Sequence, residues 1–127
     1  MQKHSLKREL LRTCASWLVV GALDAKPKAT DPATGEVSCS FTPKNGPSFV
    51  EISLHDGQLT EWRQRNGGKS AVPVPEFGAD AFVIPDFEGW ADLYVRKGSL
   101  IVRVTIPKGP TSIEMTKAVA RKALMRL

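Results

Sequence analysis

Apolar and polar residues alternate most regularly between Trp90 and Ile106, where two runs of strand-forming residues flank Lys97-Gly98. A two-residue loop at this point predicts a β-hairpin. One face of the hairpin gathers apolar side chains, with Leu93 opposite Val102 and Val95 opposite Leu100. The other face carries an aromatic, an aliphatic and two basic side chains: Tyr94, Arg96, Ile101 and Arg103. One apolar and one mixed face are typical of an antiparallel sheet that is covered on one side.

Three other segments have strand character. Residues 37–42 and 50–54 alternate between apolar and polar positions, and the turn-rich run from Pro43 to Pro47 predicts that they form a second hairpin. Residues 79–84 predict one more strand. The stretch from 71 to 78 has prolines at alternate positions, which favours an extended edge or a connector over a central strand.

Two helices are predicted in addition to these strands. Gln58 to Arg65 predicts a short helix, in which Trp62 either anchors the helix to the sheet or stacks on a ligand. Thr111 to Glu114 has the pattern of a capping box and predicts that a helix runs from there to the end of the chain. Its apolar stripe consists of Ile113, Ala120, Ala123, Leu124 and Leu127, and its remaining face is basic. A basic face is usually solvated, although anionic lipid headgroups are a possible contact.

The first 25 residues allow two interpretations. A basic stretch that ends at Arg12, an apolar stretch from Cys14 to Leu23 and a small residue at Ala25 follow the order of a secretory signal. The same residues predict an amphipathic first helix, with Leu6, Leu10, Cys14 and Trp17 at helical spacing. In the first case Cys14 leaves with the signal, and Cys39 remains as a buried thiol.

These segments predict one small α+β domain. Residues 26–35 are interpreted as a linker, and residues 36–127 as a single domain. Its fold is expected to be an antiparallel sheet of about five strands, packed on one face by an N-terminal and a C-terminal helix. The length of 127 residues allows only one hydrophobic core.

Composition and charge exclude few classes of function. The net charge of +5, from 18 basic and 13 acidic residues, is a modest bias that solubility explains. His4 and His55 stand alone, and neither Cys14 nor Cys39 lies in a zinc-binding spacing. Because no set of nucleophile, base and orienting residue is marked, we expect no enzyme activity, no metal and no cofactor.

Four segments together resemble a broad group of small exported bacterial α+β domains of uncharacterised function. They are CSFTP, AVPVPEFGADAF, LYVRKGSLIVRVTI and the terminal ARKALMRL, and the resemblance covers the chain from about residue 36 onward. Similar patterns occur in cell-envelope lipoproteins of actinobacteria, which often carry a lipidated cysteine and a paired disulfide. The resemblance implies a helix before the first strand and a place in the envelope, and it brings no catalytic residue. No lipid-attachment motif surrounds Cys14.

The sequence therefore predicts a non-enzymatic domain, periplasmic or secreted, that binds a protein or a cell-wall component. The expected binding surface is the mixed face of the main hairpin, formed by Tyr94, Arg96, Ile101 and Arg103, with Trp62 and Arg63 as a second choice. The alternative is a cytoplasmic protein that binds nucleic acid through the same aromatic and basic residues together with the basic last helix.

Overall fold

The structure is a computed structural model that describes residues 8, 10, 22–28, 37–65 and 70–127. The described residues form strands, two α-helices and one short 3-10 helix. In chain order these are β1 (Ala22–Lys28), β2 (Val37–Pro43), β3 (Val50–His55), α2 (Leu59–Arg65), β4 (Val72–Pro73), the 3-10 helix η3 (Pro75–Phe77), β5 (Phe82–Phe87), β6 (Trp90–Lys97), β7 (Leu100–Pro107) and α3 (Ser112–Arg126).

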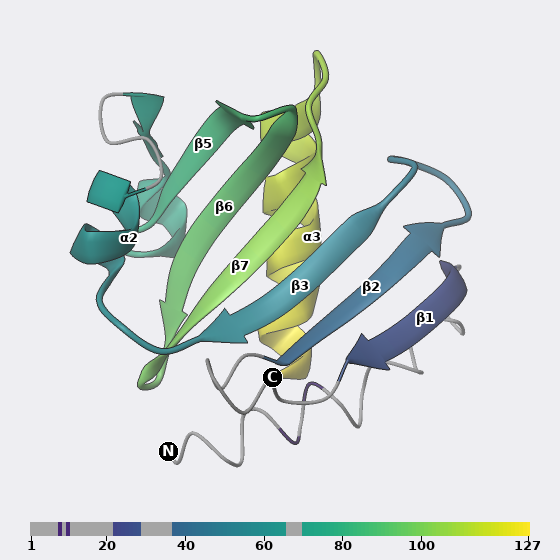
Figure 1. The fold of residues 1–127 in the computed structure, drawn as a ribbon, viewed down its shortest axis with the longest axis horizontal. Helices are drawn as coiled ribbons and strands as arrows, with labels where there is room; N and C mark the ends of the chain where they lie inside the picture. Colours follow the sequence, from purple (N-terminus) through teal and green to yellow (C-terminus); the bar gives the residue numbers. More distant parts are fainter. Residues whose placement is uncertain (1–7, 9, 11–21, 29–36, 66–69) are drawn as a thin grey trace.

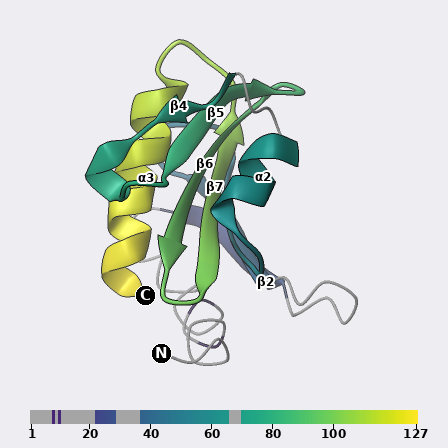
Figure 2. The same cartoon turned by 90° about the vertical axis from the view of Figure 1, so that its left-hand side faces the viewer.

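The seven described strands form one antiparallel sheet in the order β1-β2-β3-β7-β6-β5-β4 (Figure 1). Helix α3 lies against one face of the sheet and α2 against the other, as Figure 2 shows. The domain is thus α+β with an antiparallel sheet, as predicted. We call the face toward α3 the back face and the opposite one the front face.

The sheet has more strands than expected because both of its edges gain one. Residues 26–28, which were predicted to be a linker, belong to β1 and pair with β2. At the other edge β4 pairs with β5. Both added strands contain proline, which an edge strand tolerates because one side of its backbone has no partner to bond.

The main hairpin turns one residue later than predicted. Its loop is Gly98-Ser99, so Val95 pairs with Val102 and Leu93 pairs with Val104. Moving a two-residue loop by one position changes each pairing by two residues, so every side chain stays on its predicted face. Gly98 has a φ of 61°, which suits glycine as the first loop residue of a type II′ turn.

The main core lies between the back face and α3. Leu100, Val102 and Val104 are fully buried there, and Ala120 and Ala123 supply the buried face of α3. Leu10, which is helical, belongs to the same core, and Arg8 is helical as well. Residues 22–25, which the predicted N-terminal segment included, are strand and belong to β1. The remaining residues of that segment lie outside the described part of the chain.

Two local predictions are wrong. Thr111 makes no side-chain cap at the start of α3, because its φ of −114° and ψ of 16° lie outside the extended backbone region typical of a helix cap. The Glu114 carboxylate pairs with Lys117 at 3.5 Å.

Cys39 is disulfide-bonded and is no free thiol. The other cysteine of the sequence, Cys14, lies outside the described residues.

The position of Leu93 allows a test of the core. Leu93 is fully buried at the centre of the back face, so Leu93→Ala should lower the free energy of unfolding by about 2–5 kcal/mol. Met125→Ala on α3, where the side chain is 86% exposed, should change it by less than about 0.5 kcal/mol. Urea unfolding followed by circular dichroism measures both values. Equal stability of the two variants would contradict this assignment of the core.

Candidate binding surface

Helix α2 covers one end of the front face. Leu59 of α2 packs with Phe82, Ile84, Tyr94 and Ile101 of the sheet in a second apolar cluster, separate from the main core. Tyr94 and Ile101 are fully buried. The expectation that these two residues face solvent and form a binding surface is therefore wrong, because the chain returns over them directly after β3.

The aromatic rings in this cluster are closely packed. The ring of Tyr94 stacks on that of Phe82 with centroids 4.8 Å apart, and the Trp62 ring lies 5.8 Å from Tyr94. Trp62 also lies 4.7 Å from the ring of His55, at the end of β3. These contacts favour the interpretation in which Trp62 anchors a short helix.

The connection between β3 and α2 packs against the side chain of Trp62. The indole Nε1 of Trp62 donates a hydrogen bond to the carbonyl oxygen of Asp56 at 3.2 Å. Gly57 has a φ of 117°, and a Cβ atom added to it would lie 3.0 Å from the same Nε1. A side chain at Gly57 would thus strain the backbone and crowd the indole.

Three arginines line α2 and its neighbourhood. Arg63 and Arg96 are exposed, and the Arg96 guanidinium donates to Gln58 at 3.4 Å. Arg63 lies 6.0 Å from the centre of the Phe82 ring and Arg65 lies 4.6 Å from that of Trp62. These side chains remain available at the rim of the covered region, and their role in binding stays a prediction.

A buried ion pair occupies the middle of the front face. Asp92 is fully buried, and its two oxygens accept hydrogen bonds from Arg103 at 3.0 Å and from the Thr105 hydroxyl at 2.7 Å. The Arg103 guanidinium also lies 5.6 Å from the centre of the Tyr94 ring. These contacts hold the guanidinium in one orientation. The pairing is strongly favoured, because a buried carboxylate without its partner would raise the free energy of the folded state.

Arg103 remains partly accessible although it is paired. Burial lowers the pKa of Arg103, but the hydrogen bond and the charge of Asp92, with smaller contributions from Tyr94 and Glu51, outweigh burial and raise the pKa above its ordinary value. The side chain is 24% exposed. Its buried Nε has no hydrogen-bond partner within the described ranges. Arg103 is thus a permanent positive charge on the front face.

The far end of the front face carries an aromatic pair that sequence reasoning missed. Trp90, at the start of β6, is 38% exposed, and its ring meets that of Phe49 edge-on at 5.6 Å. Glu51 lies beside this pair on β3, opposite Thr105. We call Phe49, Glu51, Trp90 and Arg103 the front patch. Trp90 shares the alternation of Tyr94 and Arg96, and following that period to the start of the strand would have found it.

No described helix crosses the front patch (Figure 1). A second polar contact, between the Ser53 hydroxyl and His55 Nε2 at 2.7 Å, lies on the same face but is buried. Across the described part of the chain, no three His, Cys, Asp or Glu side chains gather in a way that could hold a metal ion. The front patch is therefore the part of the front face where an exposed aromatic ring has no described helix above it.

Comparison with known proteins gives no relative: the chain matches no family model, no curated protein and no solved structure. Its resemblance to envelope domains therefore remains an expectation. No helix within the described ranges has both the length and the apolar composition that crossing a bilayer requires.

The cover over Tyr94 can be tested by chemical modification, because Tyr94 is the only tyrosine of the chain. Tetranitromethane should leave the native protein unmodified at Tyr94 and modify it after denaturation. In Trp62→Ala the nitration rate should rise on the order of tenfold or more, because the reagent no longer needs a prior opening of α2. Mass spectrometry measures the extent of nitration.

Trp90→Ala is the matched control, since it removes a tryptophan from the same face but away from Tyr94. This variant should be nitrated as slowly as the unaltered protein. Rapid nitration of the folded, unaltered protein would contradict the described position of α2.

Proposed function

We propose that the protein is a non-enzymatic domain that acts outside the cytoplasm, in the periplasm or at the cell envelope, and binds a protein or a cell-wall component through the front patch. The observation that carries this proposal is the exposed ring of Trp90, which packs on the half-buried Phe49 and lies on the same face of the sheet as the oriented guanidinium of Arg103. An aromatic surface next to fixed charged groups combines apolar contact area with directional hydrogen bonds, as binding surfaces do.

The patch needs little rearrangement to bind. Asp92 and Thr105 hold Arg103 from within the sheet, and Phe49 supports the ring of Trp90. A group that is held in place before binding loses less conformational entropy when the partner arrives. The patch also carries charge of both signs, through Arg103 and Glu51, which favours a partner with polar groups of both kinds.

The disulfide of Cys39 supports a location outside the cytoplasm. Disulfides persist in oxidising compartments and are rare where cellular thiols keep cysteines reduced. A disulfide within one chain would have to use Cys14, the other cysteine of the sequence. Cleavage after Ala25 would remove Cys14 and would also divide β1. Export with the first segment retained is therefore the version of the proposal that we favour.

Nucleic-acid binding loses its main support. That alternative used Tyr94 as a stacking surface for bases, and Tyr94 is fully buried beneath α2. The exposed arginines near α2 remain, but a single-stranded nucleic acid also needs accessible aromatic faces along its path. The binding experiment below includes a result that would favour nucleic-acid binding.

The binding experiment uses isolated bacterial cell walls in one arm and immobilised envelope proteins in the other. Trp90→Ala should reduce the bound fraction about fivefold or more in the arm that contains the partner, because exposed aromatic anchors dominate such contacts. Glu51→Gln, which keeps the shape of the side chain, should reduce binding less. Arg103 is left intact, because its removal would leave Asp92 buried without its cation.

Met125→Ala, at an exposed position of α3, is the control and should bind like the unaltered protein. Unchanged binding of Trp90→Ala in both arms would remove the front patch from consideration. Retention on nucleic acid at low salt, with a steep loss as salt rises, would favour the cytoplasmic alternative instead.

The proposed location predicts a particular mass for the protein recovered from its own cells. The protein should be found in the envelope or periplasmic fraction, should retain Cys14, and should have a mass two hydrogens lower before reduction than after it. Mass spectrometry of the intact chain under both conditions measures this. A chain that begins at Lys26, or two free thiols in an otherwise intact chain, would contradict this version of the proposal.

A further inference from the structure

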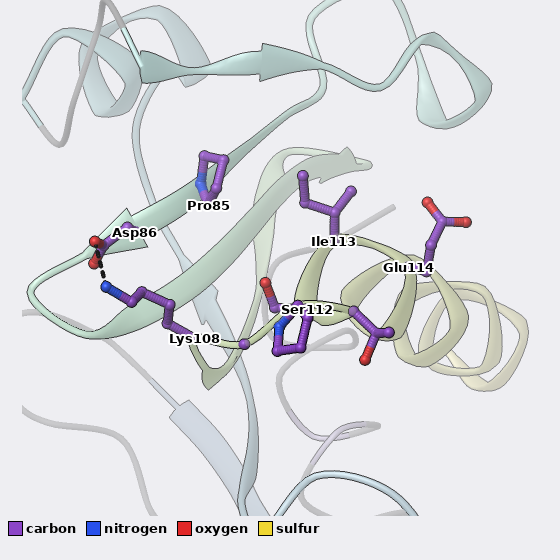
Figure 3. A pocket seen from close by; sticks show the side chains of 9 residues that line it. Pro85, Asp86, Lys108, Ser112, Ile113 and Glu114 are labelled. Atoms are coloured by element: carbon purple, nitrogen blue, oxygen red, sulfur yellow. Dashed lines mark hydrogen bonds and ion pairs between the residues drawn. The ribbon is translucent and has the colours of Figure 1, made fainter.

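The connection after β7 forms one side of a small pocket at the start of α3 (Figure 3). Its volume is about 250 Å³. The charged side chains that line it are already paired: Lys108 donates to the Asp86 carboxylate at 2.9 Å, and Glu114 pairs with Lys117 at 3.5 Å. The residues that line this pocket therefore present no unpaired charge to a ligand, and we assign the pocket no function.

The loop between β2 and β3 carries an asparagine–glycine pair in an exposed position. Asn45 is followed directly by Gly46, and both residues are exposed. Within the described ranges, neither the side-chain amide of Asn45 nor the N–H of Gly46 makes a hydrogen bond. Both groups are thus accessible to water and unpaired.

Two prolines explain why this loop has so few internal hydrogen bonds. Pro43 ends β2 and Pro47 follows Gly46, and neither has an N–H group to donate. Residues 44–48 accordingly bend the chain without forming a hydrogen-bonded turn. Because no backbone bond ties the pair down, the side chain of Asn45 can turn toward the backbone nitrogen of the next residue.

We propose that Asn45 is a site of spontaneous modification, at which the side-chain amide is lost and aspartate or isoaspartate remains. The Gly46 nitrogen, after losing its proton to hydroxide, attacks Cγ of Asn45. The new bond closes a succinimide ring while the bond from Cγ to the side-chain nitrogen breaks, and that nitrogen leaves as ammonia. Water then opens the ring at either carbonyl. The net reaction consumes one water and releases one ammonia.

Gly46 favours this reaction because it has no side chain beside the attacking nitrogen. The product carries a carboxylate in place of a neutral amide, so the net charge of +5 falls by one. Isoaspartate also adds one carbon atom to the backbone, a few residues before Phe49, whose ring lies 5.6 Å from that of Trp90. The reaction needs only water, so it does not depend on the function proposed for the front patch.

The experiment follows the intact mass of the full chain during incubation at pH 8, in an Asn66→Gln background. Asn66 is the other asparagine of the chain and also precedes a glycine, so this change leaves Asn45 as the only such pair. The mass should rise by about 1 Da with time. Peptide mapping should place the change at Asn45 and find both aspartate and isoaspartate there.

A synthetic peptide of residues 41–50 gives the reference rate. Because the loop makes no hydrogen bond that must open first, the folded protein should react within about tenfold of the peptide. Both rates should increase with pH, since the Gly46 N–H must lose its proton before its nitrogen can attack.

Three variants test the named groups. Asn45→Gln should lose the reaction, because the longer side chain would have to close a larger and less favourable ring. Gly46→Ala should slow it on the order of tenfold, because a methyl group beside the attacking nitrogen crowds ring closure. Ser48→Ala, at another exposed position of the loop, is the control and should react like the unaltered loop.

Circular dichroism of each variant reports whether it is folded. A rate in the folded protein more than about tenfold below that of the peptide would overturn the proposal, because the fold would then protect Asn45. A product with aspartate but no isoaspartate would also overturn it, since the amide would then be hydrolysed directly and without the ring. Undiminished reaction in folded Gly46→Ala would contradict the role assigned to the Gly46 nitrogen.

Discussion

The structure depends on the packing of the apolar back face of the sheet against α3. Along β7 every second side chain from Leu100 to Ile106 is fully buried on this face, and the small Ala120 and Ala123 let the helix approach it. Burying one such apolar side chain contributes about 1.5–3 kcal/mol. Because side chains alternate strictly along a strand, burial of the back face also decides which side chains the front face presents.

The parts of the front face differ in what covers or pairs their side chains. At one end Tyr94 is covered by Trp62, and in the middle Asp92 is buried but paired with Arg103. Only the end near Trp90 presents an aromatic ring to solvent without a described helix above it. The buried ion pair links these regions, because Arg103 contacts Asp92 on one side and the ring of Tyr94 on the other.

Short-range patterns predicted the elements well and the exposure of the expected surface residues only in part. Alternation assigned the right face to Leu93, Val95 and Val102 even though the turn lies one residue later, because a shift of two in the pairing leaves the faces unchanged. The capping box was wrong, because a sequence pattern does not determine the backbone angles of Thr111. Of the predicted surface residues, Arg96 and Arg103 keep some exposure, and Tyr94 and Ile101 do not.

The period-two spacing of apolar residues was enough to predict an antiparallel sheet with one apolar and one mixed face, since that spacing is a pattern among residues close together in the sequence. Whether the mixed side stays open depended on a contact between Trp62 and Tyr94, which lie far apart in the chain. The bonding of Cys39 likewise requires a second cysteine that is not its neighbour in the sequence. Such contacts leave no local pattern, because the two partners need only come together in the folded chain.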